Sequence, residues 1–167
     1  MAKMERGATV RFGTKVIHIT TGPQHATIAT TTETIRSRLV INCAGLYSDK
    51  VAAMSGSVPD LQILPFRGEY YALKKEREYL VKNLVYPVPN PNFPFLGVHF
   101  TRMIKGGIEA GPTAVLAFRR EGYSRWQIHP RELAETLLFP GFQKLARRYW
   151  DDGWMELKRS FSKKLFV

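Results

Sequence analysis

Residues 39–45 (LVINCAG) constrain the fold of this chain more than any other segment. Three apolar residues in a row, without alternation, favour a strand that is buried on both faces, as in a parallel sheet. A glycine turn follows at once, and residues 50–54 then have a helical pattern. A strand, a glycine turn and a helix in this order can place backbone N–H groups and the N-terminus of the helix against a bound anion. An ordinary tight turn that binds nothing fits the same spacing and is the simpler interpretation.

The sequence before this segment predicts a β-hairpin. Residues 1–7 are typical of the end of a helix, and residues 9–20 and 25–32 are rich in apolar and β-branched residues. The Thr-Gly-Pro sequence at 21–23 supplies the turn between these two predicted strands. Residues 55–59 have the composition of a linker.

The sequence after this linker predicts strands followed by helices. Strands are expected at 61–73, 79–86, 95–102 and 108–110. Four prolines in 87–94 exclude a helix or a central strand there. Lys105-Gly106-Gly107 indicates a hairpin turn, and Gly111-Pro112 is expected to end the return strand. Helices are expected at 130–139 and 142–150, so the fold class is α+β.

A net charge of +11, from 25 Lys and Arg against 14 Asp and Glu, leaves a non-enzymatic function open. A basic module could bind nucleic acid or an anionic surface. Seven basic residues near the C-terminus form the densest cluster: Lys144, Arg147, Arg148, Lys158, Arg159, Lys163 and Lys164. Such runs are commonly the solvated face of a helix. No RNA- or DNA-binding motif accompanies them, so we expect no specific nucleic-acid partner.

The single cysteine, Cys43, excludes an intramolecular disulfide and suits a reducing compartment. Its place in the apolar run predicts a buried thiol rather than a nucleophile. The histidines and Cys43 are too scattered for a metal site. No apolar stretch reaches the ~18–20 residues of a membrane-spanning helix, and the N-terminus has no signal-peptide pattern. We therefore expect a cytoplasmic location, with peripheral attachment at the inner membrane as the alternative.

Several motifs in sequence order resemble those of one enzyme family. Residues 40–49 (VINCAGLYSD) resemble the VNxAGxWS element of FAD enzymes in the D-amino-acid-oxidase-like superfamily. Residues 65–71 (PFRGEYY) resemble the PxRGxY entry into the substrate domain. The later motifs are 86–89 (YPVP), 93–101 (FPFLGVHFT), 109–118 (EAGPTAVLAF) and 120–123 (REGY). In this order they resemble the FAD-dependent L-2-hydroxyglutarate oxidase/dehydrogenase family.

The resemblance implies two domain portions and an oxidation reaction. Residues 1–64 would be a partial FAD-binding domain, with a hairpin, a buried strand, a glycine turn and a helix. Residues 65–167 would belong to the substrate domain, a mixed, mainly antiparallel sheet flanked by helices. The reaction would convert a 2-hydroxy dicarboxylate, L-2-hydroxyglutarate, to 2-oxoglutarate, and the parent enzyme could associate peripherally with a membrane.

The resemblance also implies that segments are missing. The family's Rossmann-type G-x-G-x-x-G and its C-terminal region have no counterpart in this chain. We therefore expect an internal fragment that is inactive alone. The alternative is a functionless folded remnant that self-associates through exposed apolar surface.

His99 is the candidate catalytic base, because a neutral imidazole can accept the hydroxyl proton near pH 7. Strand alternation places Thr101 on the same face, where it would contact the substrate. If that face points to solvent or to the core, His99 is structural. Arg67 is the candidate ligand of a substrate carboxylate, and a pairing with Glu69 or with a backbone carbonyl is the alternative.

The remaining candidates are tyrosines and the glycine turn. Tyr70, Tyr86 and Tyr123 could donate hydrogen bonds to the substrate or only pack. By resemblance, the FAD-binding residues are Ala44, Gly45, Leu46, Tyr47 and Ser48. Gly45 suits close backbone contact because it has no side chain, whereas Tyr47 could simply pack in the core.

Overall fold

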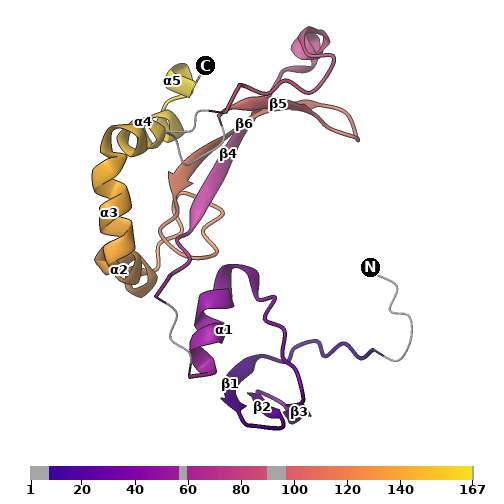
Figure 1. Ribbon diagram of the computed structural model, residues 1–167. Helices are drawn as coiled ribbons and strands as arrows, with labels where there is room; N and C mark the ends of the chain where they lie inside the picture. The colour runs from indigo at the N-terminus through magenta and orange to yellow at the C-terminus, as the bar shows by residue number, and fades with distance from the viewer. Residues whose placement is uncertain (1–7, 57–59, 90–96, 167) are drawn as a thin grey trace. The chain divides into compact units, whose positions relative to one another are not determined.

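The computed structural model describes residues 8–56, 60–89 and 97–166, and the chain divides into two compact units, 1–63 and 64–167 (Figure 1). Helices and antiparallel sheets occur together, which confirms the α+β class. The sequence placed the division between residues 64 and 65. The predicted helix end at 1–7, most of the predicted linker and part of the proline-rich segment lie outside the described residues.

The first unit contains a three-stranded antiparallel sheet. Its strands are β1 (Val16–Thr21), β2 (Ala26–Thr30) and β3 (Thr34–Ser37), in that spatial order. The predicted hairpin is therefore confirmed. Ile19 of β1 lies directly opposite Ile28 of β2, and both side chains are buried. The short helix η1 (Gly45–Tyr47) and the helix α1 (Ser48–Met54) follow the sheet.

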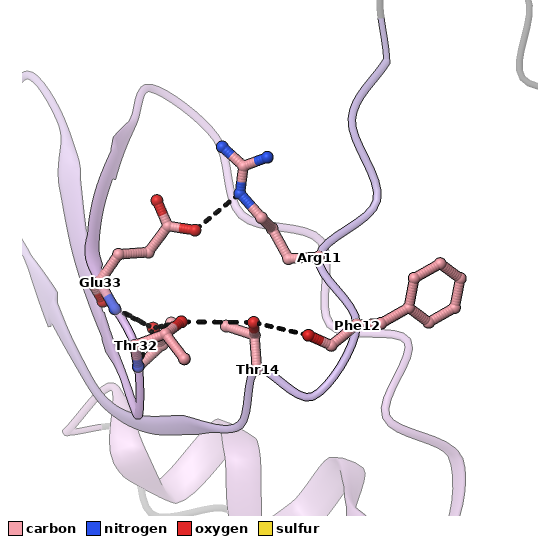
Figure 2. A network of polar contacts seen from close by, with 6 residues as sticks. Arg11, Phe12, Thr14, Thr32 and Glu33 are labelled. Carbon is pink, nitrogen blue, oxygen red and sulfur yellow. Dashed lines mark hydrogen bonds and ion pairs between the residues drawn. The ribbon is translucent and has the colours of Figure 1, made fainter.

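The strand predicted at 9–20 begins only at Val16, because the chain turns at Phe12 and Gly13. Gly13 has a φ of +64°, which glycine adopts without a steric penalty and which interrupts an extended chain. Polar contacts tie this turn to the loop between β2 and β3 (Figure 2). Arg11 Nε lies 2.6 Å from Glu33 Oε1, and Thr32 Oγ1 donates to Thr14 Oγ1 at 3.3 Å.

The strand predicted to be buried at Leu39 to Ile41 is wrong for this structure. Strand β3 ends at Ser37, and the side chains of Leu39 and Ile41 are 72% and 74% exposed. A strand buried on both faces needs paired strands beside it and layers above and below it. Within the described residues of the first unit, the sheet ends at β3, so residues 39–41 have no paired strand beside them and no covering layers. Cys43, which was expected to be buried, is exposed for the same reason.

The second unit contains a sheet with strand order β4-β6-β5, antiparallel throughout. Its strands are β4 (Phe66–Ala72), β5 (His99–Arg102) and β6 (Ile108–Leu116), and the short helix η2 (Lys75–Leu80) follows β4. The predicted hairpin turn joins β5 to β6. The buried core includes Ile108, Ala110, Val115 and Ala117, all on β6 or next to it.

Helices follow the sheet in the second unit, as predicted. They are α2 (Pro130–Leu138), α3 (Pro140–Arg148), α4 (Trp150–Phe161) and α5 (Lys163–Phe166). Figure 1 shows α2, α3 and α4 along one side of the sheet. The first turn of α2 is closed by His129, whose Nδ1 accepts the backbone N–H of Glu132 at 3.3 Å.

Two predictions for this unit are wrong. Residues 79–86 do not form a strand: η2 includes Leu80, and Val85 makes a single bridge to Phe100. The prolines that follow at once cannot donate ladder hydrogen bonds, so pairing stops there. Strand β6 also continues through Gly111-Pro112, where the sequence predicted a break. A proline is tolerated here because the pairing with β4 is irregular between Glu69 and Tyr71.

Candidate functional site

The irregular point of the second sheet brings several predicted site residues together. Glu69 pairs with Thr113 and Tyr71 with Ala110, so Tyr70 lies at the shift in register. On the other side of β6, His99 pairs with Gly111. A Cβ at Gly111 would lie 2.7 Å from Tyr70 Cδ1, which means that the Tyr70 ring packs directly on this glycine. Gly111 therefore contacts the Tyr70 ring and pairs with His99 in the neighbouring strand.

Two contacts fix the orientation of the half-buried His99 side chain. Its ring centroid lies 4.7 Å from that of Tyr86, with the two planes tilted by 30°. Its Nδ1 lies 3.3 Å from the carbonyl oxygen of Gly97. A carbonyl can only accept, so this hydrogen bond requires a proton on Nδ1 and leaves Nε2 of the neutral ring as an acceptor. Thr101, two residues along β5, is also half-buried and pairs with Glu109.

Arg67 is held by the pairings that the sequence offered as alternatives to ligand binding. Its Nη2 and Nε lie 2.7 Å and 3.2 Å from Glu69 Oε1. Its Nη1 donates to the carbonyl oxygen of Gly122 at 3.4 Å. The two side chains are only 11% and 16% exposed, so this ion pair is largely shielded from water. Ser160 Oγ of α4 donates to the same Glu69 oxygen at 2.9 Å.

We call Arg67, Glu69, Arg125 and Ser160 the Glu69 cluster. The Nη2 atom of Arg125 lies 3.7 Å from Glu69 Oε2, and its guanidinium carbon lies 5.3 Å from the centre of the Phe161 ring. One carboxylate thus joins β4, the loop that carries Arg125, and α4. This arrangement fixes the position of the Arg67 guanidinium before any ligand is present.

A pocket of about 590 Å³ opens beside this cluster, and we call it the Tyr70 pocket. It is lined by Arg67, Gly68, Glu69, Tyr70, Tyr71, Tyr123, Ser124, Arg125 and Trp126. The predicted substrate residues Arg67, Tyr70 and Tyr123 therefore meet at one surface, where Tyr70 and Tyr123 are 51% and 77% exposed. His99, Tyr86 and Thr101 are not among these lining residues and group together around β5 instead.

In the first unit, the turn predicted to bind FAD forms η1 and the start of α1. Asn42 closes the turn at both ends: its Nδ2 donates to Ser48 O at 2.8 Å, and its Oδ1 accepts from Ala44 N at 3.2 Å. Ser48 Oγ donates to Gly45 O at 2.8 Å. Gly45 has a φ of +55°, and no atom lies within 4 Å of where a Cβ would be. The backbone of Gly45 is therefore open to close approach by a flat group.

Sequence reasoning missed the residues that position these groups. Glu69 was considered only as a partner of Arg67, although its spacing puts both side chains on one face of a strand. Asn42 was part of a matched motif, but no role was given to its side chain. The carboxylate of Asp49 is buried and accepts hydrogen bonds from Lys50 N at 2.8 Å and Ile63 N at 3.2 Å. No local signal in the sequence indicates the contact with Ser160, which is 91 residues from Glu69.

Two other kinds of feature do not occur in the part of the chain that the structure describes. No group of three His, Cys, Asp or Glu side chains comes together there in a way that could hold a metal ion. None of the helices in that part combines the length and the apolar character needed to span a bilayer.

Comparison with known proteins identifies the relatives of this sequence. Residues 2–160 match the family described as FAD dependent oxidoreductase. The L-2-hydroxyglutarate dehydrogenase of Indibacter alkaliphilus is 63% identical over 162 residues, which cover 96% of this chain and 41% of the relative. The mitochondrial L-2-hydroxyglutarate dehydrogenase of Caenorhabditis elegans is 50% identical over 86% of the chain and 31% of its own length. The human mitochondrial enzyme is 47% identical over 77% of the chain and 28% of its own length.

Proposed function

Since this chain belongs to the FAD dependent oxidoreductase family, we propose that the complete enzyme oxidises L-2-hydroxyglutarate to 2-oxoglutarate. The observation that carries the proposal is the 63% identity to an L-2-hydroxyglutarate dehydrogenase over nearly the whole chain. The chain spans 41% of the length of that relative, so the activity is proposed for the complete enzyme. The residues of the Tyr70 pocket and of β5 support the same chemistry.

In this proposal, the Tyr70 pocket binds a substrate carboxylate. A guanidinium has five N–H donors, and the Arg67 contacts to Glu69 and Gly122 use one each on Nε, Nη1 and Nη2. One N–H therefore remains on each terminal nitrogen. Each of these donors can reach a carboxylate oxygen of the substrate. Tyr70 and Tyr123 line the same pocket, and their hydroxyl groups would donate to the substrate.

His99 would remove the proton of the substrate hydroxyl group. Because the Nδ1 proton is directed at Gly97 O, the Nε2 atom is the one that accepts the proton of the substrate hydroxyl group. The imidazolium that forms keeps its Nδ1 hydrogen bond, and its positive charge lies against the Tyr86 ring. When bound, FAD supplies the oxidant that accepts the hydride from the substrate Cα atom, and 2-oxoglutarate is the product.

The turn Ala44 to Ser48 is the proposed contact to FAD, because its geometry fits a flat group. Gly45 leaves open space where any other residue would place a Cβ. Asn42 fixes the turn through hydrogen bonds at both of its ends, so the backbone is already ordered. Any side chain at Gly45 would occupy that space and would also strain the backbone at a φ of +55°.

The test is a titration of FAD into the complete enzyme after its flavin has been removed, followed by quenching of flavin fluorescence. We expect saturable quenching that Gly45→Ala weakens about tenfold or more. Gly13→Ala is the matched control, since Gly13 also has a positive φ and open surroundings. Equal affinities for Gly45→Ala and Gly13→Ala, or no quenching at all, would contradict a cofactor role of the turn.

A further inference from the structure

Two arginines, Arg67 and Arg125, supply the positive charge in the described lining of the Tyr70 pocket. The side chain of Arg67 is 11% exposed and donates two hydrogen bonds to Glu69 Oε1 and one to Gly122 O. The side chain of Arg125 is 35% exposed, and its Nη2 lies 3.7 Å from Glu69 Oε2, which is beyond the length of a hydrogen bond. Arg125 is therefore the more accessible and the less restrained of the two.

An aromatic ring supports the guanidinium group of Arg125. Its central carbon lies 5.3 Å from the centre of the Phe161 ring, at the end of α4. A contact of this kind stabilises the positive charge without using an N–H donor. The five N–H groups of a guanidinium lie in its plane and match the oxygens of a carboxylate. Arg125 can therefore offer a fork of donors to an anion in the pocket.

The two guanidinium groups approach different oxygens of one carboxylate, which limits the distance between them. Because both Glu69 oxygens are bonded to one carbon at about 1.2 Å, the Nη2 atoms of Arg67 and Arg125 lie no more than roughly 9 Å apart. An extended chain of five carbons measures about 5 Å between its end carbons, from C–C bonds of about 1.5 Å. With a hydrogen bond of about 2.9 Å at each end, a five-carbon dicarboxylate can contact both guanidinium groups at once.

We propose that Arg125 binds the distal carboxylate of the substrate and thereby selects a 2-hydroxy dicarboxylate over a 2-hydroxy acid with an uncharged end. This inference rests on the function proposed above and assigns the second carboxylate, for which that function has no residue yet. Arg67 is fixed by three hydrogen bonds, so it holds the carboxylate next to the reacting carbon, where alignment matters most. Arg125 is less restrained and adjusts to the far end of the chain.

The first test measures binding to the complete enzyme by titration calorimetry. Glutarate carries two carboxylates, and pentanoate has the same five carbons with one. We expect Arg125→Gln to weaken glutarate binding about tenfold or more and to change pentanoate binding by less than about threefold, because one carboxylate still has Arg67. Arg125→Lys keeps the charge without the fork and should recover part of the loss. Arg131→Gln, at an exposed position on α2, is the matched control and should bind both acids like the wild type.

The second test compares L-2-hydroxyglutarate with L-2-hydroxypentanoate, which keeps the hydroxy acid and the chain length but ends in a methyl group. We expect Arg125→Gln to lower kcat/KM for L-2-hydroxyglutarate about tenfold or more, mainly through a higher KM, and to change kcat/KM for L-2-hydroxypentanoate by less than about threefold. Arg67→Gln should lower kcat/KM for both substrates, since both keep the carboxylate next to the reacting carbon.

The outcomes separate this inference from the proposed function. Equal losses of kcat/KM on the two substrates in Arg125→Gln, or a glutarate affinity that neither Arg125 variant changes, would overturn the role of Arg125 and leave the oxidation standing. If the wild type does not oxidise L-2-hydroxyglutarate but binds glutarate through Arg125, the proposed function is wrong and the carboxylate site remains.

Discussion

Replacing Glu69 by glutamine tests the main polar cluster of the second unit. Glu69 Oε1 accepts hydrogen bonds from two Arg67 nitrogens and from Ser160, and Arg125 lies near Oε2. Glutamine keeps the shape and one acceptor oxygen but loses the charge that offsets two guanidinium groups. Hydrogen bonds to charged groups contribute about 1.5–3 kcal/mol each, and losing one partner of a fully buried ion pair costs about 3–5 kcal/mol.

The partial exposure of this pair, 11% for Arg67 and 16% for Glu69, places the expected loss below that of a fully buried pair. We therefore expect Glu69→Gln to lower the free energy of unfolding by about 2–3 kcal/mol. For a unit of this size, the melting temperature should fall by roughly 10 °C. Urea unfolding followed by circular dichroism gives the free energy, and an unchanged m-value shows that the transition itself is the same.

Glu135→Gln is the control for this measurement. Its ion pair with Arg131, at 3.3 Å, is solvent-exposed on the arginine side, and such pairs contribute about 1 kcal/mol or less. A loss in Glu69→Gln no larger than that in Glu135→Gln would refute the reasoning. In a double-mutant cycle, Glu69→Gln and Arg67→Gln should show a coupling of at least about 1 kcal/mol.

Further predictions concern backbone packing and charge. Gly111→Ala should destabilise the second unit by about 2 kcal/mol or more in urea unfolding, because the new Cβ would lie 2.7 Å from Glu69 O and from Tyr70 Cδ1. Gly153→Ala, inside α4 with no atom within 4 Å of the added Cβ, should instead stabilise it by about 0.5–1 kcal/mol, and a loss of stability would contradict this account. Retention on heparin should not exceed that of a charge-matched control protein across a salt gradient, because specific nucleic-acid binding is not expected, and a markedly stronger retention would favour the basic-module alternative.

The sequence predicted the elements whose signals are local. Lys105-Gly106-Gly107 predicted the hairpin between β5 and β6 because glycine favours tight turns, and both glycines have a positive φ. The proline near the start of the segment 130–139 and its helical periodicity predicted α2 within one residue. His99 and Thr101 both lie on β5, and the geometry of a strand puts residues two positions apart on one face. In each case, neighbouring residues determine the conformation.

The features that the sequence did not predict depend on distant parts of the chain. The apolar run at Leu39 to Ile41 is exposed because burial requires layers that the described residues of its unit do not form. Strand β6 continues through Pro112 only because of the irregular pairing opposite Tyr70. The Glu69 cluster joins residues 91 positions apart. Periodicity within a short window contains no information about such contacts.

The role of His99 is tested most directly by anaerobic reduction of the bound flavin in the complete enzyme. Loss of the oxidised-flavin absorbance after addition of L-2-hydroxyglutarate reports the oxidation of substrate in a single turnover. We expect rapid loss in the wild type and a rate lower by about 10²-fold or more in His99→Gln, the usual contribution of a general base. His25→Gln, in the turn between β1 and β2, should react like the wild type. Equal rates for His99→Gln and the wild type, or no reduction of the flavin by L-2-hydroxyglutarate, would contradict the proposed function.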